Sequence, residues 1–300
     1  MSVEVASVDP VFARNPVEAA SLRDRHVCII GLGSGGSALS LMAARAGVGR
    51  FTLVDPDTLA LENVGRHMLS RESAGQLKVK AVKRAIKAVN PAAEVSAIAK
   101  DFRTLNPAEY LNAAPPNLLV GATDSFACEA MLNALSLEAG IPAVYAGCWG
   151  AAATGEILYV VPGKTPCFEC FAGFRRDTVP LPTGDPRKYT DPAFDGTRVE
   201  SQAGLWPNIL IISGIAFQMV LALLLPDSPM ARNLIDYEHT LWLVNVADYD
   251  SALQPLAVTF GRLPKGCPVS DESRLGDLGS DLKPTTERRS TQLPSVSNTQ

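Results

Sequence analysis

Short apolar runs alternate with longer stretches of small and apolar residues in the first half of the chain. The run at residues 26–30 ends in glycines, the run at residues 50–54 ends in Asp55, and residues 37–46 between them contain no helix breaker. Short apolar runs bounded by turn residues predict buried strands, and the longer stretch predicts a helix. Together they predict a β-α-β unit, the building block of parallel sheets.

The alternation of strand and helix continues along the chain. Apolar residues repeat at helical spacing over residues 75–89, with lysines and an arginine on the outward face. Further elements are predicted as strands over residues 94–99, 117–123, 141–146 and 155–161, and as a helix over residues 125–139. This order predicts an α/β fold with a Rossmann-like, doubly wound and mostly parallel sheet.

The pattern changes in the second half of the chain. Residues 173–204 are crowded with proline, glycine and charge, and predict a mobile crossover loop. Residues 209–225 are nearly all apolar but fall just short of the roughly 18–20 residues of a membrane span, so they predict a buried helix. Two β-rich runs, residues 239–246 and 255–263, predict a β-rich C-terminal part of the same domain.

The predicted organisation is one main domain with two flanking segments. We expect the domain over residues 25–270, an N-terminal arm over residues 1–24, and a tail over residues 271–300. The tail is rich in Ser, Thr, Asp and Pro and has almost no large apolar residues. A segment of that composition cannot bury enough apolar surface to fold, so we expect it to be disordered.

Composition and charge exclude several classes of protein. The chain has 300 residues, 47% of them hydrophobic and 19% charged, with a formal net charge of −4. Such a mildly acidic chain has no overall positive charge to attract polyanions, so we expect no nucleic-acid and no membrane partner. Its six cysteines are not needed as staples in a domain of this size, and its first residues carry no secretory signal pattern. We therefore expect a reducing, cytoplasmic location.

A glycine-rich motif joins the first predicted strand to the first predicted helix. Gly31, Gly33 and Gly36 form the pattern G-x-G-x-x-G, with Ser34 inside it, and Asp55 ends the next strand. Backbone N–H groups at such a turn hold phosphate oxygens, while the carboxylate binds ribose hydroxyls. The motif alone predicts a nucleotide site whose usual ligand is a dinucleotide, so an NAD(P)-dependent oxidoreductase is one interpretation.

Charged residues farther along the chain favour phosphate chemistry. Arg66 and Lys78 can neutralise charge on an attacked α-phosphate and on leaving pyrophosphate, and Asp124, at a predicted strand end, can hold Mg²⁺. An attacking carboxylate is already ionised at pH 7 and needs no general base. Taken singly, Lys78 could be a solvated helix lysine, and Arg66 could pair with Glu62 in a loop.

Four stretches bring these residues into one pattern. They are residues 27–33, residues 46–57 with Asn63 and Arg66 downstream, residues 75–91, and residues 122–124. From Arg25 to about Leu158 the chain resembles the adenylate-forming superfamily of ThiF, MoeB and the ubiquitin-activating enzymes. The resemblance implies that Mg·ATP activates the C-terminal carboxylate of a small ubiquitin-like or sulfur-carrier protein, giving an acyl-adenylate and pyrophosphate.

The resemblance also implies roles for single residues. Arg66, Lys78 and Asp124 are expected to act in catalysis, and Asp124 is also expected to support Mg²⁺. The full expected ATP site comprises Gly31, Gly33, Ser34, Gly36, Asp55, Asp57, Asn63, Arg66, Gln76, Lys78 and Asp124. Dimeric members insert an arginine into the partner's ATP site, so the resemblance implies a homodimer, with Arg14 as the candidate arginine.

A cysteine pattern matches the structural zinc site of many members of this superfamily. Cys167 and Cys170 match the first pair of ligands. Cys267 matches the first residue of the second pair, and Ser270 occupies the fourth ligand position. Because serine is a poor zinc ligand, Asp271 or water would complete the site. The alternative is a small packed cluster of cysteines without metal.

Departures from the superfamily pattern leave the later steps and the acceptor open. Residues 173–204 contain no cysteine for a thioester, so the chain looks closer to MoeB-like members, which stop at the adenylate. Cys148 is expected to pack as a small apolar residue. His67 follows Arg66 where MoeB-like members usually have glutamine, and a ribosomal peptide destined for modification is a second acceptor class. A non-catalytic scaffold with this fold is a further alternative.

Overall fold

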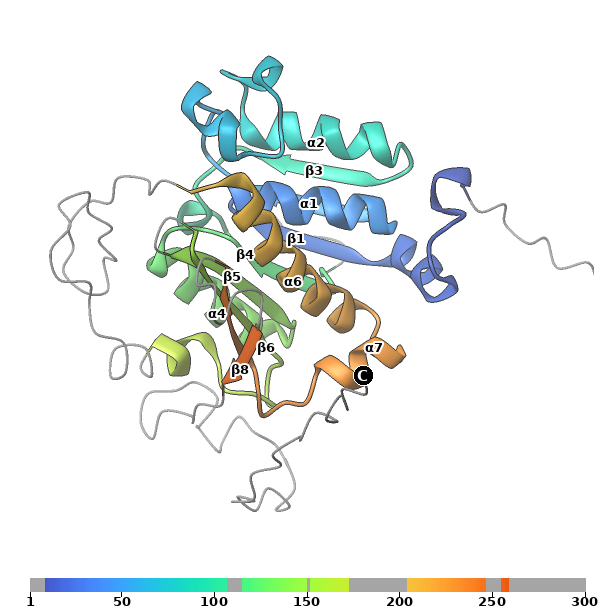
Figure 1. Cartoon of the computed structure of the whole chain (residues 1–300), viewed down its shortest axis with the longest axis vertical. Helices are drawn as coiled ribbons and strands as arrows, with labels where there is room; N and C mark the ends of the chain where they lie inside the picture. Colours follow the sequence, from blue (N-terminus) through green and yellow to red (C-terminus); the bar gives the residue numbers. More distant parts are fainter. Residues whose placement is uncertain (1–8, 107–114, 150–151, 173–203, 247–254, 259–300) are drawn as a thin grey trace, which may run out of the picture.

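The structure, a computed structural model, describes residues 9–106, 115–149, 152–172, 204–246 and 255–258. Its centre is a sheet that has eight strands within these residues, in the order β3-β2-β1-β4-β5-β6-β7-β8 (Figure 1). The strands are β1 (His26–Ile30), β2 (Arg50–Val54), β3 (Glu94–Ile98), β4 (Leu118–Gly121), β5 (Ala143–Trp149), β6 (Thr154–Val160), β7 (Leu241–Asn245) and β8 (Pro255–Val258).

The first five strands are parallel and the last three are antiparallel to their neighbours. The parallel pairs are β3 with β2, β2 with β1, β1 with β4, and β4 with β5. The chain runs outward from β1 to β3 and then returns to place β4 on the other side of β1. This arrangement confirms the predicted Rossmann-like, doubly wound sheet with a β-rich C-terminal part. Its switch point, where such sheets bind ligands, lies between β1 and β4.

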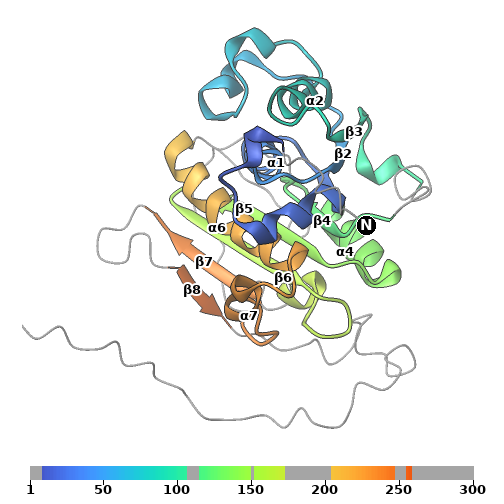
Figure 2. The ribbon, with the colours of Figure 1, turned by 90° about the vertical axis from the view of Figure 1, so that its right-hand side faces the viewer.

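Helices cover both faces of the sheet (Figures 1 and 2). The longer helices are α1 (Ser34–Ala46), α2 (Lys78–Val89), α4 (Phe126–Ala139) and α6 (Trp206–Leu224), and a short helix, α7 (Pro229–Leu234), follows α6. On one face α1 lies between α2 and α6, and α4 packs on the opposite face. Short 3-10 helices fill the connections: η1 (Pro10–Phe12), η2 (Val17–Asp24), η3 (Leu61–Arg66), η4 (Arg71–Ser73) and η5 (Phe102–Thr104).

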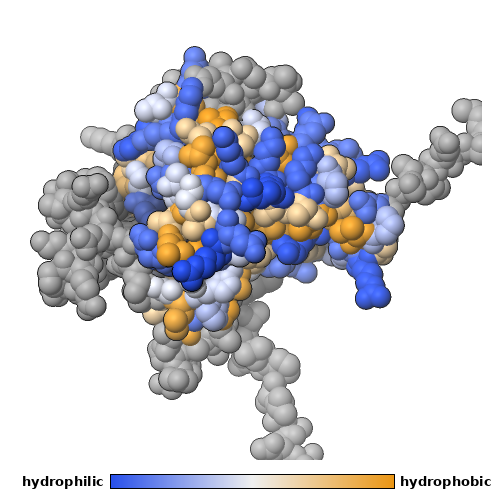
Figure 3. Space-filling view, turned by 90° about the horizontal axis from the view of Figure 1, so that it is seen from above, coloured by the Kyte–Doolittle hydropathy of each residue, from blue (hydrophilic) through white to orange (hydrophobic). Residues whose placement is uncertain are grey.

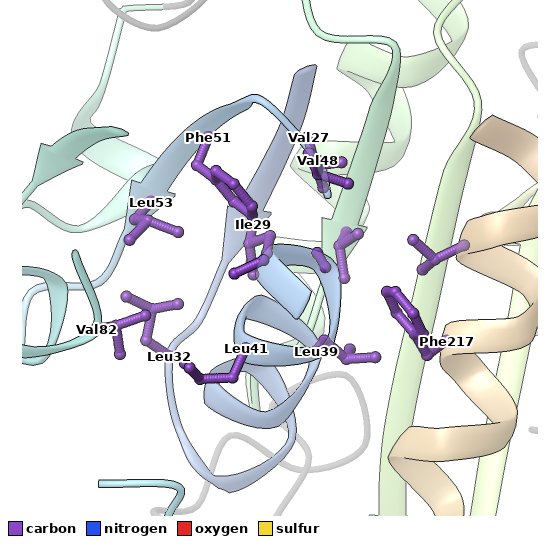
Figure 4. Close-up of a cluster of buried hydrophobic side chains, with 14 of the residues drawn as sticks. Val27, Ile29, Leu32, Leu39, Leu41, Val48, Phe51, Leu53, Val82 and Phe217 are labelled. Atoms are coloured by element: carbon purple, nitrogen blue, oxygen red, sulfur yellow. The ribbon is translucent and has the colours of Figure 1, made fainter. Parts of the chain in front are cut away.

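The central strand β1 is buried along its whole length, which accounts for its apolar run from Val27 to Ile30. Alternate residues point to opposite faces, so Val27 and Ile29 join one core while Cys28 and Ile30 join the other. Figure 4 shows the first core, where Ile29 and Phe51 of the sheet meet side chains of α1, α2 and α6. On the solvent side of α2 the basic residues Lys80, Lys83 and Arg84 are exposed, as predicted. The face that Figure 3 shows mixes hydrophilic and apolar side chains.

Several element boundaries differ from the predicted ones, each for a local reason. Helix α1 begins at Ser34, because Gly33 of the motif is its N-cap residue and Gly36 lies in its first turn. Helix α2 begins at Lys78 because Gly75 has a φ of 79° and Leu77 forms a bridge with Thr58. Strand β5 continues to Trp149 because its end pairs with Thr154 at the start of β6. Helix α7 was not predicted, since its apolar pattern spans under two turns.

Residues 9–24 pack against the C-terminal end of α1. Leu22 is fully buried, and the Asn15 Nδ2 group donates to the carbonyl oxygens of Arg45 and Ala46, each at 3.2 Å. Gly47 ends α1 with a φ of 101° and lies beside the Phe12 ring. The predicted crossover loop over residues 173–204, apart from Gly204, and the predicted tail lie outside the described residues, as do residues 259–263 of the last β-rich run.

Helix α6 is the element predicted as a buried helix at residues 209–225. By length and composition it is the one helix of the described residues that could cross a membrane, and half of its most apolar window is buried inside the protein. The core helix of a folded domain can have the same length and apolar composition. Here α6 packs against α1 and against β4, β5 and β6, and Ile212 lies directly on Gly155 of β6.

We predict that Ile212→Ala lowers the free energy of unfolding by about 2–4 kcal/mol, because it removes a fully buried side chain between α6 and the sheet. Gln218→Ala, at an exposed position of the same helix, is the control and should change it by less than about 0.5 kcal/mol. Urea unfolding followed by circular dichroism measures both. Equal effects of the two substitutions would show that α6 is not packed in this way.

Candidate functional site

The glycine motif forms a tight loop at the switch point of the sheet. Gly31 has a φ of 85°, and a Cβ atom there would lie 2.5 Å from the carbonyl oxygen of Ala122, just after β4. A Cβ atom on Gly36 would lie 1.9 Å from the Gly31 carbonyl oxygen. Side chains at these two positions would therefore push the loop away from the sheet. The close fit brings the N-terminus of α1 to the strand ends, where its first N–H groups have no partner within the helix.

Asp55, at the end of β2, ties this loop to the neighbouring strand. Its Oδ2 atom accepts a hydrogen bond from the Leu32 N–H at 2.7 Å, and its Oδ1 atom accepts one from the Asp57 N–H at 2.8 Å. Burial raises the pKa of Asp55 above its ordinary value, while Lys78 and the two N–H groups oppose that shift. The carboxylate keeps lone pairs that could accept ribose hydroxyl groups.

Lys78 reaches the same two carboxylates from the first turn of α2. Its Nζ atom lies 2.8 Å from Asp57 Oδ2 and 3.7 Å from Asp55 Oδ1. The Lys78 side chain is only 10% exposed, so the alternative of a solvated helix lysine is wrong. The Asp57 side chain is 63% exposed, and an ion pair with so exposed a partner is weak. An arriving phosphate could therefore replace Asp57 as the partner of Lys78.

Asn63 and Arg66 lie together on η3, beside the loop. The Arg66 Nη2 group donates to Asn63 Oδ1 at 3.3 Å. Gln76, in contrast, is held by its own neighbourhood, because its amide donates to the Glu72 carbonyl and accepts from Arg84. Asn63 and Arg66 are thus joined by a hydrogen bond, whereas the Gln76 side chain is bonded to residues of its own segment and of α2.

Acidic side chains gather on the β4 side of the site. Asp124 is exposed just beyond β4, where the chain meets the glycine loop. Glu129, in the first turn of α4, has its pKa raised to about 8, first by burial and then by the negative charges of Asp124 and Glu156. Sequence reasoning missed Glu129. The only available signal was its place in the first turn of a predicted helix, where carboxylates are common for dipole reasons alone.

His67 is the second residue that sequence reasoning left without a role. It is buried, its Nε2 atom lies 2.8 Å from the Leu32 carbonyl oxygen, and its Nδ1 atom lies 3.1 Å from the Leu69 backbone nitrogen. Burial, aided by the positive charge of Lys78, lowers the pKa of His67 below its ordinary value of 6.5. The signal in the sequence was its position directly after Arg66.

The cysteines divide into two groups. Cys167 and Cys170 are buried with their sulfur atoms 3.8 Å apart, on the same face of the sheet as α4. Cys267, Ser270 and Asp271 lie outside the described residues, and those residues that are described contain no set of three or more His, Cys, Asp or Glu side chains arranged for a metal. Cys148 packs against the other core, and burial raises its pKa to about 12, which disfavours the reactive thiolate.

Arg14 is exposed just after η1, at the C-terminal end of α1. The glycine loop lies at the opposite end of that 13-residue helix, roughly 20 Å away at 1.5 Å per residue. Within one chain, Arg14 therefore lies too far away to contact the glycine loop.

Comparison with known proteins finds a family and several relatives. The model of a family described as the ThiF family matches residues 12–254. The sulfur carrier protein ThiS adenylyltransferase of Bacillus subtilis is 31% identical over 158 residues, which are 52% of this chain and 46% of that protein. Ubiquitin-like modifier-activating enzyme 5 of Dictyostelium discoideum is 28% identical over 160 residues, 50% of this chain and 42% of that protein. The match thus spans less than half the length of these relatives.

Solved structures share the fold at lower identity. The crystal structure of E. coli MccB with ATP has a TM-score of 0.63 and 21% identity, and the match covers 84% of this chain and 68% of that one. A structure of E. coli MccB with MccA-N7isoASN has a TM-score of 0.64 at 21% identity, with 84% and 69% covered. At such identity the likeness shows the fold alone.

We predict that the stability of the protein falls more steeply below pH 6.5 than that of a His67→Gln variant. The folded state holds His67 neutral, with a pKa below 6.5, while the unfolded state takes up the proton at about pH 6.5. The contribution of neutral His67 to the free energy of unfolding is therefore complete above pH 6.5 and is lost as the pH falls through the lower pKa of the folded state. The free energy of unfolding falls by at most about 1.4 kcal/mol per pH unit from this cause. Urea unfolding at pH 7.5, 6.5 and 5.5 measures it. Parallel curves for the two proteins would contradict the assignment.

Proposed function

This chain belongs to the ThiF family, and on that basis we propose that its strand-end site binds Mg·ATP and transfers AMP to a carboxylate. The observation that carries the proposal is the placement of Lys78, whose ammonium group is buried beside Asp55 at the mouth of the glycine loop. A buried cation next to a helix N-terminus favours a ligand with several negative charges.

The ligand contacts follow from the geometry of the site. The N-terminus of α1 and the glycine loop would hold the phosphates, and Asp55 would accept the ribose hydroxyls. Lys78 would exchange Asp57 for a phosphate, and Arg66 would contribute a second positive charge from η3. Asp124, exposed at the end of β4, is placed to hold Mg²⁺, which would screen the negative charge of the pyrophosphate.

The proposed reaction is a displacement at the α-phosphorus. An ionised carboxylate oxygen forms a bond to this atom while the bond to the bridging oxygen breaks, and the electron pair leaves with pyrophosphate. No proton is transferred, which agrees with a site whose one buried histidine in the described residues near the loop has its pKa lowered by burial. Arg66 and Lys78 stabilise the charge that builds up on the departing phosphates.

The proposed acceptor is the C-terminus of a small ubiquitin-like or sulfur-carrier protein. Its support is the similarity to relatives that bear the names of a ThiS adenylyltransferase and a ubiquitin-like modifier-activating enzyme. A peptide is the second candidate, favoured by the fold shared with MccB, which was crystallised with MccA. The NAD(P)-dependent oxidoreductase is less favoured, because hydride transfer gives no role to Lys78 and Arg66.

We predict that Lys78→Ala weakens Mg·ATP binding by at least about tenfold, because it removes the buried positive charge beside the phosphate loop. Lys80→Ala, two residues farther along α2 and exposed, is the matched control and should stay within about twofold of the wild-type protein. Thermal shift with Mg·ATP, NAD⁺ and NADP⁺ measures the binding. Circular dichroism checks the fold, since Lys78→Ala leaves Asp55 without its cation.

Stabilisation by a dinucleotide but not by Mg·ATP would overturn the proposed function. If Mg·ATP binds, pyrophosphate exchange with a ubiquitin-like protein ending in Gly-Gly, and separately with a short peptide, distinguishes the two acceptor classes. Exchange with neither class, despite ATP binding, would support the non-catalytic scaffold.

We further propose that Cys167 and Cys170 form half of a structural zinc site, with Cys267 as the third ligand. Two thiolates bound to one tetrahedral zinc at about 2.3 Å lie about 3.8 Å apart. The Cys167 and Cys170 sulfur atoms lie 3.8 Å apart, and both side chains are buried. The pair therefore fits the metal without rearrangement.

Metal analysis of protein purified in reducing buffer without chelator should give about one zinc per chain. Cys167→Ser and Cys170→Ser should each lose most of that zinc, whereas Cys148→Ala, which changes a thiol elsewhere in the domain, should retain it. Zinc-free wild-type protein, or equal zinc in all variants, would leave the packed cysteine cluster as the correct interpretation.

A further inference from the structure

The His67 ring joins two segments of the site that are far apart in the sequence. Its Nε2 atom contacts the carbonyl oxygen of Leu32 in the glycine loop, and its Nδ1 atom contacts the backbone nitrogen of Leu69. The next residue, Met68, donates its N–H to Ser37 of α1 at 3.4 Å. The segment that follows Arg66 is therefore bound directly to the phosphate loop and to its helix.

The two partners of the ring determine its tautomer. A carbonyl oxygen can only accept, so Nε2 must carry the hydrogen that is donated to Leu32. A backbone N–H can only donate, so Nδ1 must be the acceptor for Leu69. The neutral Nε2–H form satisfies both bonds, and it agrees with a pKa lowered chiefly by burial.

Leu32 is held at three points. Its side chain is fully buried in the same core cluster as Ile29 and Val82 (Figure 4), its N–H donates to Asp55, and its carbonyl accepts from His67. The two hydrogen bonds act on different peptide groups, because the N–H belongs to the peptide before Leu32 and the carbonyl to the peptide after it. Asp55 and His67 therefore fix consecutive peptide planes of the loop.

The peptide plane that His67 fixes also carries the N–H of Gly33. In a planar trans peptide the carbonyl and the following N–H point in opposite directions, so the Gly33 N–H points away from the His67 ring. Gly33 is the N-cap residue of α1, and a Cβ atom placed there would meet no described atom within 4 Å. The N-cap of α1 therefore borders open space on the side of that Cβ position, and an anion held there would lie beside the peptide group that carries this N–H.

We propose that His67 is a positioning residue, which orients the Gly33 N–H toward the phosphates of the bound nucleotide by holding the Leu32 carbonyl. The proposal rests on the proposed ATP site. It assigns His67 a role in phosphate affinity and none in contacts with the nucleoside, because Asp55 is held through the other peptide plane.

Two substitutions separate the bonds of the ring. His67→Gln keeps an N–H donor near the position of Nε2 and so retains the Leu32 contact. His67→Asn keeps an acceptor near the position of Nδ1 and so retains only the Leu69 contact. We expect His67→Asn to weaken Mg·ATP binding by about tenfold, and His67→Gln to stay within about threefold of the wild-type protein. Adenosine, which has no phosphate, should bind all three proteins with equal affinity.

Isothermal titration calorimetry with Mg·ATP and with adenosine distinguishes the outcomes. An equal loss of affinity for Mg·ATP and for adenosine in His67→Asn would mean that His67 supports the fold of the whole site, and would overturn the positioning role. Unchanged Mg·ATP affinity in His67→Asn would also overturn it while leaving the proposed function intact. If the wild-type protein binds neither ligand at pH 8, the proposed function itself fails, and this inference fails with it.

A measurement on the wild-type protein covers the case in which His67→Asn does not fold. Nitrogen NMR of ¹⁵N-histidine-labelled protein at pH 7 reports the tautomer of each ring. We expect His67 to be the Nε2–H form, with an Nε2 resonance that shifts on addition of Mg·ATP and not on addition of adenosine. The Nδ1–H tautomer, or an equal response to both ligands, would overturn the proposal.

Discussion

The fixed position of Leu32 is the constraint on which the candidate site depends. A loop between a strand and a helix normally has freedom to move, yet this residue has its side chain in the core and both neighbouring peptide groups in hydrogen bonds. Each bond comes from a different part of the chain, one from the end of β2 and one from the segment after η3. Ordering the loop in advance reduces the entropy lost when a ligand binds.

The sheet topology explains why these parts meet. In a parallel sheet the carboxyl ends of all strands lie at one edge, and here β1, β2 and β4 deliver the glycine loop, Asp55 and Asp124 to that edge. The position of the helices on the sheet is equally important for the site. Helix α2 begins at Lys78, so its first side chain lies at the end of β2. The antiparallel strands β6 to β8 extend the sheet on the far side of β5, away from the switch point between β1 and β4.

The fold was largely predictable, because β1 and its neighbours β2 and β4 are almost wholly buried and therefore consist mainly of apolar residues. The glycine motif and Asp55 were predictable as parts of the site, since their spacing reflects backbone geometry. What could not be predicted was how side chains pair across the site. Whether Lys78 is solvated or buried depends on where α2 begins, and that is set by the turn at Gly75 and the bridge at Leu77. His67 had only its position after Arg66 as a signal, and its hydrogen bond could not be predicted because its partner Leu32 lies 35 residues earlier.

The distribution of charge divides the site into two halves. Lys78 and Arg66 lie on the β2 side, while Asp124, Glu129 and Glu156 lie on the side of β4 to β6. An anionic acceptor that approached the second half would be repelled if all three carboxyl groups were ionised. Burial and the neighbouring carboxylates raise the pKa of Glu129 to about 8, so at pH 7 this group is mostly neutral. The negative charge of the half on the side of β4 to β6 is thus smaller than the number of its acidic residues suggests. Asp124 is the exposed carboxylate of these three and is available to a cation.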